Sequence, residues 1–347
     1  MNTTPYRAGI IGLGFIGGGD QVSGDALGQQ VSNLDGNHAD ALSSHERVEL
    51  AAGASRDTGR RDRFAQRTGA KTYASWEEML DKEDLDIVSV ATYTPQHAPI
   101  TIACAQRGIR AIWCEKPIAS TLADAEAMCA ACDKAGSLLV INHNRRFDTG
   151  CRRLRDHVAA GGLGELTSTN LQWNAGRLGN VGTHTIDAAL MFTGQRIAAV
   201  SATLDDAGKP DCRGSDFRDP GGWGIMRLDN GVMITIDAAD YAKTPYRMVV
   251  NGTEGRATAG RFRSDIVLEY WDGRHDVWPG PRESSMNRAM SEMVQALDGD
   301  APFPYAAEEA THILEAIVAC HASSAKSAAW VELPLQGGAR EIEVLTG

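Results

Sequence analysis

Short apolar runs alternate with helical patterns through the first 145 residues of the chain. The runs that we predict to be strands are 7–12, 48–54, 71–73, 86–91, 111–114 and 138–141. Helical patterns between them cover 38–42, 64–69, 76–80, 98–106 and 122–135. Repeated β-α-β alternation is typical of a parallel sheet with helices on both faces. We therefore predict an α/β domain over residues 1–145, with a doubly wound parallel sheet.

The second half of the chain has a different pattern, in which short strands follow one another with turns between them. The predicted strands are 166–173, 197–204, 224–228, 232–237, 247–250 and 265–270. Asp229-Asn230-Gly231 is a strong hairpin signal, and such turns favour an antiparallel sheet. Helices are predicted over 150–160, 286–297 and 307–325, the last two packing back against the first domain. We predict a second, α+β domain over 146–347.

Length, charge and composition limit the classes of protein to which the chain can belong. A chain of 347 residues suggests roughly two domains. A net charge of -11 argues against nucleic-acid binding, which needs a basic face. Since there is no secretion signal and no run approaching the ~18 apolar residues of a membrane span, we expect a cytoplasmic protein. Cys129 and Cys132 lie within a helical pattern without further ligand residues, so we expect no metal.

A glycine motif follows the first predicted strand directly. Gly12-Leu13-Gly14-Phe15-Ile16-Gly17 has the G-x-G-x-x-G spacing, in which the glycines permit a tight turn, close approach of a pyrophosphate and close helix packing. With 37 glycines in the chain the motif alone is weak evidence, and its place after a strand supports it. We predict that Gly12, Gly14, Phe15, Ile16 and Gly17 bind a dinucleotide.

The segment 18–37 shows no helical periodicity, so we interpret it as an insertion of 20 residues. Gly17 and Ser55 are 38 positions apart, and without the insertion they would be 18 apart, close to the ~20 expected before the ribose-reading residue. Ser55 and Arg56 suit a 2′-phosphate, which favours NADP over NAD. Asp57 would favour NAD if it took that position, and the stretch could also be only a charged, solvated turn.

The run Ala111-Ile112-Trp113-Cys114 ends in Glu115-Lys116-Pro117. Ligands of open parallel sheets bind beyond the carboxyl ends of the strands, so Lys116 is placed to point into a ligand cleft. Pro117 restricts the backbone of Lys116 to non-helical conformations.

Four blocks together resemble the Gfo/Idh/MocA family of dehydrogenases, which includes glucose–fructose oxidoreductase and inositol dehydrogenase. They are Gly12-x-Gly14-x-x-Gly17, Ala91-Thr-Tyr-Thr-Pro95-Gln-His97, Glu115-Lys116-Pro117 and Gly182-Thr183-His184-Thr-Ile-Asp187. The resemblance implies a Rossmann domain followed by a domain with a large, mostly antiparallel sheet, which often forms a dimer or tetramer contact. It implies NADP or NAD as cofactor and a sugar, sugar derivative or cyclitol as substrate. The residues that it adds to the cofactor site are Thr92, Thr94, Pro95, His97, Glu115 and Lys116.

The resemblance also implies catalytic roles. Lys116 would polarise the substrate oxygen and His184 would act as general base in hydride transfer. His184 and Asp187 stand at i and i+3, on one helical face, although such a pair is also typical of a histidine merely held by an acid at a helix start. Many family members carry an aspartate four residues before this histidine, where the chain has Asn180. Asn180 would orient the hydroxyl and Asp187 the imidazole.

Further substrate contacts are expected from Arg146, Trp173 and Arg177. Arg145 and Arg146 could equally form an interdomain salt bridge, and a tryptophan in a sheet is often part of the core. Other activities stay open: reduction of an aldehyde or imine, redox-neutral glycoside cleavage with a retained cofactor, or a non-catalytic cofactor sensor. The expected partners are a small sugar or polyol and further copies of the chain.

Overall fold

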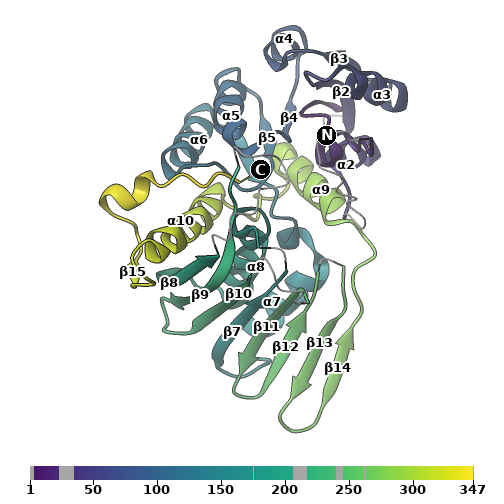
Figure 1. Ribbon diagram of the computed structural model, residues 1–347. Helices are drawn as coiled ribbons and strands as arrows, with labels where there is room; N and C mark the ends of the chain where they lie inside the picture. Colours follow the sequence, from purple (N-terminus) through teal and green to yellow (C-terminus); the bar gives the residue numbers. More distant parts are fainter. Residues whose placement is uncertain are drawn as a thin grey trace. The chain divides into compact units, whose positions relative to one another are not determined.

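The computed structural model describes residues 4–22, 35–174, 176–205, 217–239, 245–261 and 263–346, so the predicted insertion at 18–37 lies largely outside the described residues. The chain forms two compact units (Figure 1). Unit 1 comprises Met1–Ala119, Asp124–Asn142 and Glu283–Glu309, and unit 2 comprises Ser120–Ala123, His143–Arg282 and Ala310–Gly347. The sequence predicts one contiguous division at residue 145, whereas unit 1 also includes 283–309 and unit 2 also includes 120–123.

Unit 1 is built on a parallel six-stranded sheet in the order β3-β2-β1-β4-β5-β6. This doubly wound order has its switch point between β1 and β4, where such folds bind nucleotides. The strands are β1 (Tyr6–Ile11), β2 (Val48–Ala54), β3 (Lys71–Tyr73), β4 (Ile87–Val90), β5 (Ala111–Cys114) and β6 (Leu138–Ile141). Every residue of β4 and β5 is buried, as expected for central strands covered on both faces. The predicted parallel α/β domain is confirmed.

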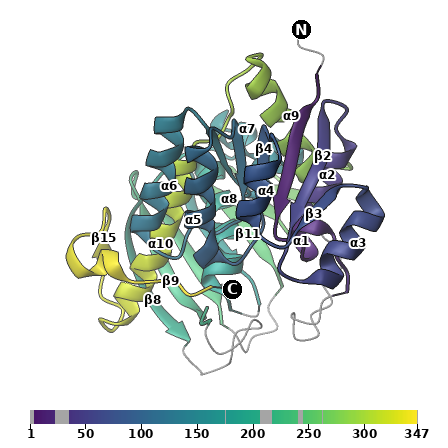
Figure 2. The same cartoon turned by 90° about the horizontal axis from the view of Figure 1, so that it is seen from above.

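Helices cover both faces of this sheet, with α2 and α9 on one face and α5 and α6 on the other (Figure 2). Side chains of Asn37, Asp57, Ser75 and Ser284 cap α2, α3, α4 and α9. The helices of unit 1 are α1 (Phe15–Gly18), α2 (His38–Ser44), α3 (Thr58–Thr68), α4 (Trp76–Lys82), α5 (His97–Gln106), α6 (Leu122–Ala135) and α9 (Ser285–Asp298). Helix α9 belongs to unit 1, as the sequence predicts for its segment.

Unit 2 contains a nine-stranded sheet in the order β14-β13-β12-β11-β7-β10-β9-β8-β15. Its described pairs are antiparallel apart from β7 with β10, so the predicted antiparallel sheet is confirmed as a mixed, mostly antiparallel one. The strands are β7 (Leu166–Gln172), β8 (Ile197–Asp205), β9 (Gly221–Leu228), β10 (Met233–Ala238), β11 (Arg247–Gly252), β12 (Gly255–Ala259), β13 (Ile266–Tyr270), β14 (His275–Trp278) and β15 (Val331–Glu332).

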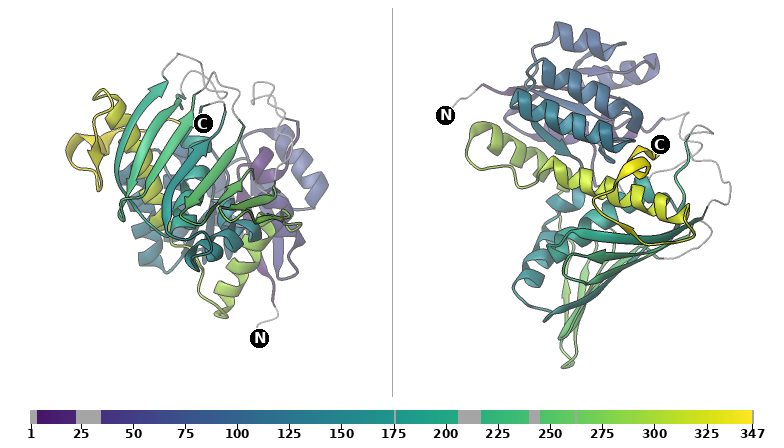
Figure 3. Two further views of the ribbon diagram at one scale, coloured as in Figure 1. Left: turned by 90° about the horizontal axis from the view of Figure 1, so that it is seen from below. Right: turned by 90° about the vertical axis from the view of Figure 1, so that its left-hand side faces the viewer.

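One face of this sheet carries the helices of unit 2, and Figure 3 shows the opposite face without a helix over it. The helices are α7 (Thr149–Ala159), α8 (Thr183–Thr193) and α10 (Ala307–Ser324). Burial alternates along the strands accordingly: Ile234 and Ile236 of β10 are buried, whereas Met233 and Thr235 point outward. Helix α10 belongs to unit 2 from Ala310 onward, while its first residues, up to Glu309, belong to unit 1, and its packing against the first domain stays a prediction. Among the described helices, none is both long and apolar enough to cross a membrane.

Candidate functional site

The glycine turn closes the carboxyl end of β1. Gly12 has a left-handed backbone (φ 101°), and a Cβ there would lie 2.3 Å from the carbonyl oxygen of Ala91. A Cβ on Gly17 would lie 2.0 Å from the carbonyl oxygen of Gly12, so packing within unit 1 requires both glycines. A Cβ on Gly14 would meet only the Arg60 guanidinium, at an ordinary 3.6 Å. The protein itself therefore gives no reason for glycine at position 14, whereas close approach of a ligand does.

The carboxyl end of β2 holds the predicted ribose-reading residues. Ser55 is half-buried and Arg56 is exposed. The carboxylate of Asp57 accepts a hydrogen bond from the backbone N–H of Arg60 at 2.8 Å and so caps α3. Because Oδ1 is engaged in the cap, Asp57 would have to bind the ribose through Oδ2 in the alternative that favours NAD.

Arg60 and Arg63 lie beside the glycine turn with a carboxylate between them. Arg63 donates two hydrogen bonds to Asp20, at 2.8 and 2.7 Å, and the Nε atom of Arg60 lies 3.7 Å from Asp20 Oδ2. Burial would raise the pKa of Asp20, but the hydrogen bonds from Arg63 outweigh it and hold that pKa below its usual value. Asp20 stays ionised, fixes the direction of Arg63 through two hydrogen bonds and forms a longer ion pair with Arg60.

His97 joins the turns that follow β4 and β5. Its ring is fully buried, with Nδ1 2.9 Å from the carbonyl oxygen of Pro117 and Nε2 3.2 Å from that of Thr92. Burial lowers the pKa of His97, and a neutral ring donates to one of these carbonyls at a time. The sequence predicts that His97 contacts the cofactor, whereas both of its ring nitrogens lie next to backbone carbonyl oxygens of the protein. Nearby, Thr94 is buried and Pro95 is exposed.

Glu115 is held by a buried network that sequence reasoning did not find. Its Oε1 atom accepts a hydrogen bond from Asn142 at 2.6 Å and lies 3.0 Å from Nε2 of His38. The other ring nitrogen of His38 lies 2.6 Å from the hydroxyl of Ser89. Burial would raise the pKa of Glu115, but His38, Lys116 and Asn142 lower it to about 2. A buried carboxylate that is ionised at neutral pH thus anchors the turn, and a contact of Glu115 with the cofactor stays a prediction.

Lys116 follows this anchor directly and is half-buried. Its backbone N–H donates to Oε2 of Glu115 at 3.3 Å, and the Lys116–Pro117 peptide bond is cis. The lysine is therefore carried at the carboxyl end of β5 by a turn with a fixed internal hydrogen bond, as the sequence predicts for a residue at a strand end.

In unit 2, helix α8 carries the predicted base. His184 is half-buried in the first turn of α8, and Asp187 is fully buried one turn later. The Asp187 carboxylate accepts a hydrogen bond from Nε of Arg146 at 2.6 Å and lies 3.8 Å from Nδ1 of His143. Arg146 therefore forms a salt bridge within unit 2, which differs from the interdomain bridge that was one of its two predicted roles.

His143 is a further residue of this cluster that carries no motif signal. Its Nε2 atom lies 2.9 Å from the hydroxyl of Thr183, and its ring meets that of His184 edge to face, with centroids 5.9 Å apart. The ring of His143 thus lies between His184 and the ion pair of Asp187 and Arg146.

Three predicted substrate residues lie on the segment before α8. Trp173 is fully buried and its indole N–H donates to the carbonyl of Gly176 at 2.7 Å, so it belongs to the core of unit 2 instead of contacting substrate. Arg177 has a left-handed backbone (φ 61°). The backbone N–H of Asn180 donates to the buried carboxylate of Asp219 at 2.8 Å. Asn180 and Arg177 are half-buried.

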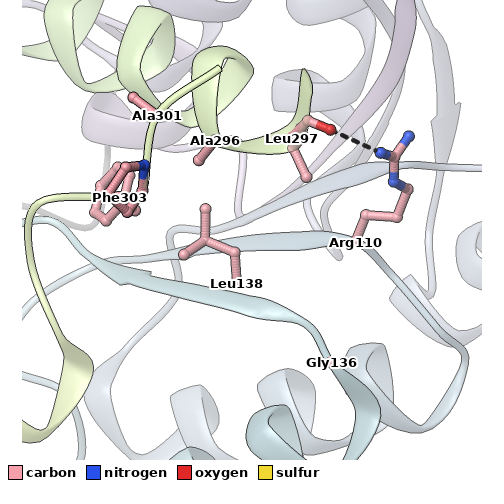
Figure 4. Close-up of a pocket in the computed structure, with 8 residues that line it drawn as sticks. Arg110, Gly136, Leu138, Ala296, Leu297, Ala301 and Phe303 are labelled. Carbon is pink, nitrogen blue, oxygen red and sulfur yellow. Dashed lines mark hydrogen bonds between the residues drawn. The ribbon is translucent and has the colours of Figure 1, made fainter. Parts of the chain in front are cut away.

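A cavity of about 310 Å³ lies at the opposite edge of the unit 1 sheet, where β5 and β6 begin (Figure 4). Arg110, which donates to the carbonyl of Leu297, lines it together with Leu138 and Phe303. Gly12 and Lys116 lie at the carboxyl ends of the strands, where we predict the cofactor to bind. This cavity, at the amino ends, is therefore separate from the predicted cofactor site.

Two family models match the chain. Residues 6–143 match an oxidoreductase family with an NAD-binding Rossmann fold, and residues 151–258 match the Gfo/Idh/MocA C-terminal domain. The chain belongs to the Gfo/Idh/MocA family of oxidoreductases. The resemblance drawn from the four sequence blocks is therefore confirmed.

Individual relatives are enzymes of sugar metabolism by name. The chain is 36% identical to D-apiose dehydrogenase of Paraburkholderia graminis over 129 residues, which are 37% of this chain and 34% of that protein. It is 28% identical to D-xylose 1-dehydrogenase (NADP(+)) 2 of Haloferax volcanii over 82% of this chain and 92% of that protein. Levoglucosan dehydrogenase, solved with NADH and levoglucosan, has the same fold, with a TM-score of 0.79 at 20% identity over 96% of this chain and 100% of that one.

Proposed function

We propose that the protein is an NAD(P)-dependent oxidoreductase that transfers a hydride between the nicotinamide and a carbinol or carbonyl carbon of a sugar, sugar derivative or cyclitol. The observation that carries the proposal is the turn from Gly12 to Gly17, in which a Cβ on Gly14 would contact only the Arg60 guanidinium. The names of the relatives, which act on D-apiose and D-xylose, support the substrate class.

Two side chains share the work at the reacting oxygen. When bound, the nicotinamide accepts or supplies the hydride. In the oxidation direction His184 takes the hydroxyl proton, and Lys116 stabilises the negative charge that develops on the same oxygen. The Asn180 amide orients the hydroxyl but takes no proton, which leaves proton transfer to His184.

Asp187 acts on His184 indirectly in this proposal. Its Oδ1 atom is bound to Arg146 and lies near His143, and the ring of His143 packs against His184. Its role is therefore to fix the surroundings of the base as the buried salt-bridge partner of Arg146.

The test is a screen of purified protein with D-xylose, D-apiose, levoglucosan and myo-inositol, each with NADP⁺ and NAD⁺, following reduced-cofactor absorbance. Lys116→Ala and His184→Ala are expected to lower kcat by about 10²- to 10⁴-fold, whereas exposed Lys134→Ala and His275→Ala retain it. Full turnover by either site variant would refute the role of that residue. Product without net absorbance change would indicate redox-neutral chemistry, and cofactor binding without product would indicate a sensor.

We further propose that NADP is preferred. Ser55 and Arg56 follow β2, where a hydroxyl and a guanidinium suit a 2′-phosphate, while one carboxylate oxygen of the neighbouring Asp57 is engaged in capping α3. Comparing the dissociation constants of NADPH and NADH by fluorescence tests this, and tighter binding of NADH would overturn it.

We propose that the open face of the unit 2 sheet mediates self-association. Trp223 and Ile225 of β9 are each 41% exposed on it, and Met233 of β10 is 36% exposed. Adjacent large apolar side chains on one face suit a second copy of the chain. Ile225→Glu is expected to lower the sedimentation coefficient of the assembly, while Val22→Glu, at an exposed apolar position of unit 1, leaves it unchanged.

A further inference from the structure

The carboxylate of Asp219, just before β9, collects three hydrogen bonds within unit 2. It accepts from the backbone N–H of Gly179 at 2.6 Å, from that of Asn180 at 2.8 Å and from the hydroxyl of Thr346 at 2.8 Å. Asp219 is buried, so these donors replace the water that an exposed carboxylate would bind.

The backbone around Asp219 continues this contact along the turn Leu178–Gly182. The N–H of Arg177 donates to the carbonyl of Asp219 at 3.1 Å, and that of Leu178 donates to the carbonyl of Pro220 at 2.9 Å. The turn that carries Asn180 is therefore bonded along one side to the residues before β9.

The carboxyl-terminal segment forms the other side of this arrangement. Val344 and Thr346 are fully buried, and the N–H of Arg218 donates to the carbonyl of Leu345 at 2.8 Å. A Cβ on Gly179 would lie 3.1 Å from Asp219, from Val344 and from Thr346, so the turn is in tight contact with the segment. Residues 344–346 are thus packed against the turn.

The buried environment of Asp219 differs from that of an exposed surface carboxylate. Burial raises the pKa of Asp219, although the hydrogen bonds from Gly179, Thr346 and Asn180 act in the opposite direction. A carboxylate at this position costs free energy through desolvation, and what it provides is a set of acceptors for two adjacent backbone N–H groups.

We propose that Asp219 and Thr346 are positioning residues, which fix the backbone of Gly179 and Asn180 and thereby the amide of Asn180 for the substrate. This inference rests on the proposed function, since it takes Asn180 as a substrate contact. Thr346 itself touches no reacting atom in this scheme, and its hydroxyl acts through Asp219.

The test compares Thr346→Val, which keeps the shape but removes the hydroxyl, with Thr346→Ser, which keeps the hydroxyl. Hydrogen exchange is followed in peptides covering residues 176–183, and KM and kcat are measured with the sugar that gives the best turnover. Since one hydrogen bond is worth about 1 kcal/mol, or about five-fold, Thr346→Val is expected to speed exchange and raise KM about five-fold. Its kcat should stay within two-fold, and Thr346→Ser should match the wild type in both measurements.

Unchanged exchange in Thr346→Val would overturn the inference, and so would faster exchange with an unchanged KM. If Thr346→Val fails to fold, Asp219→Asn replaces it, because the amide keeps the shape and loses one acceptor; faster exchange and a raised KM are again expected. If the wild type turns over no sugar of the panel, the proposed function has failed, while exchange still decides whether Thr346 holds the turn.

Discussion

The Nε2 atom of His38 lies 3.0 Å from the Oε1 atom of Glu115, 77 positions further along the chain and wholly inside unit 1. His38 begins α2, and Glu115 follows β5. Because Lys116 is the next residue and its backbone N–H donates to the same carboxylate, the helix after the glycine turn helps to fix the turn that carries the proposed catalytic lysine.

Removing the imidazole should destabilise the protein. In His38→Ala the buried carboxylate of Glu115 loses one of its two side-chain partners, and breaking a buried pair typically costs about 3 kcal/mol. The free energy of unfolding in urea is expected to fall by about that amount, and kcat to fall with it. His275→Ala, at an exposed histidine, should change the free energy by less than about 0.5 kcal/mol. Equal stability of both variants would contradict the role of His38.

The charge of Glu115 predicts a pH dependence. Folding lowers its pKa from 4.5 to about 2, which stabilises the folded state by about 3 kcal/mol at neutral pH. The sign follows from the lowered pKa: this contribution is complete above pH 4.5 and is lost as the pH falls toward 2. Urea unfolding of wild type and Glu115→Gln should therefore differ most at pH 7, with the difference shrinking by about 2 kcal/mol at pH 3. A constant difference would speak against an ionised anchor.

Substitutions at two glycines of the turn should have different effects, one on folding and the other on cofactor binding. Gly17→Ala should lower the melting temperature strongly, because its Cβ would collide with the Gly12 carbonyl. Gly14→Ala should melt like the wild type but bind NADPH at least about ten-fold more weakly, since one methyl group prevents close approach of the pyrophosphate. Calorimetry and fluorescence titration check the two halves, and unimpaired NADPH binding by Gly14→Ala would refute a pyrophosphate at this turn.

The buried ion pair in unit 2 should show strong coupling. Arg146→Ala leaves the Asp187 carboxylate without its guanidinium and is expected to cost about 3 kcal/mol, part of which Asp187→Asn recovers. A double-mutant cycle in urea should give a coupling energy above about 1 kcal/mol. The exposed pair Arg155–Asp156 serves as the control and should give less than about 0.5 kcal/mol. Equal coupling energies would contradict the burial of the first pair.

The sequence alone predicts the strand boundaries correctly where the local apolar pattern agrees with the burial of the strand. The segments 48–54, 71–73, 111–114 and 138–141 match β2, β3, β5 and β6 residue for residue, since most of these parallel strands are near-continuous apolar runs. Strand β12 was not predicted because alanines are its only apolar residues, and β14 was not predicted because it is an edge strand with exposed side chains.

Within the candidate site, only residues that belong to short sequence motifs could be predicted from the sequence. Lys116 and His184 stand in short blocks that the family shares, so they could be named from the sequence. The partners of Glu115 could not, because Asn142 and His38 are 27 and 77 positions away and nothing local marks them. The aromatic side chain of Trp173 is of a kind that suits a sugar ring, and only its burial shows that it belongs to the core.

Unit 1 is assembled from three separate stretches of the chain, the last of which is Glu283–Glu309. Tyr6 donates to Asp298 at 2.7 Å and Ser285 donates to Asp35 through its backbone at 2.9 Å, so the earliest residues need α9 as a partner. During synthesis on the ribosome, the nucleotide-binding unit therefore cannot complete its contacts until about residue 309 has left the exit tunnel, by which time strands β7 to β14 of unit 2 have already left it. A fragment that stops near residue 145 should consequently be a poor substitute for the nucleotide-binding unit in ligand studies.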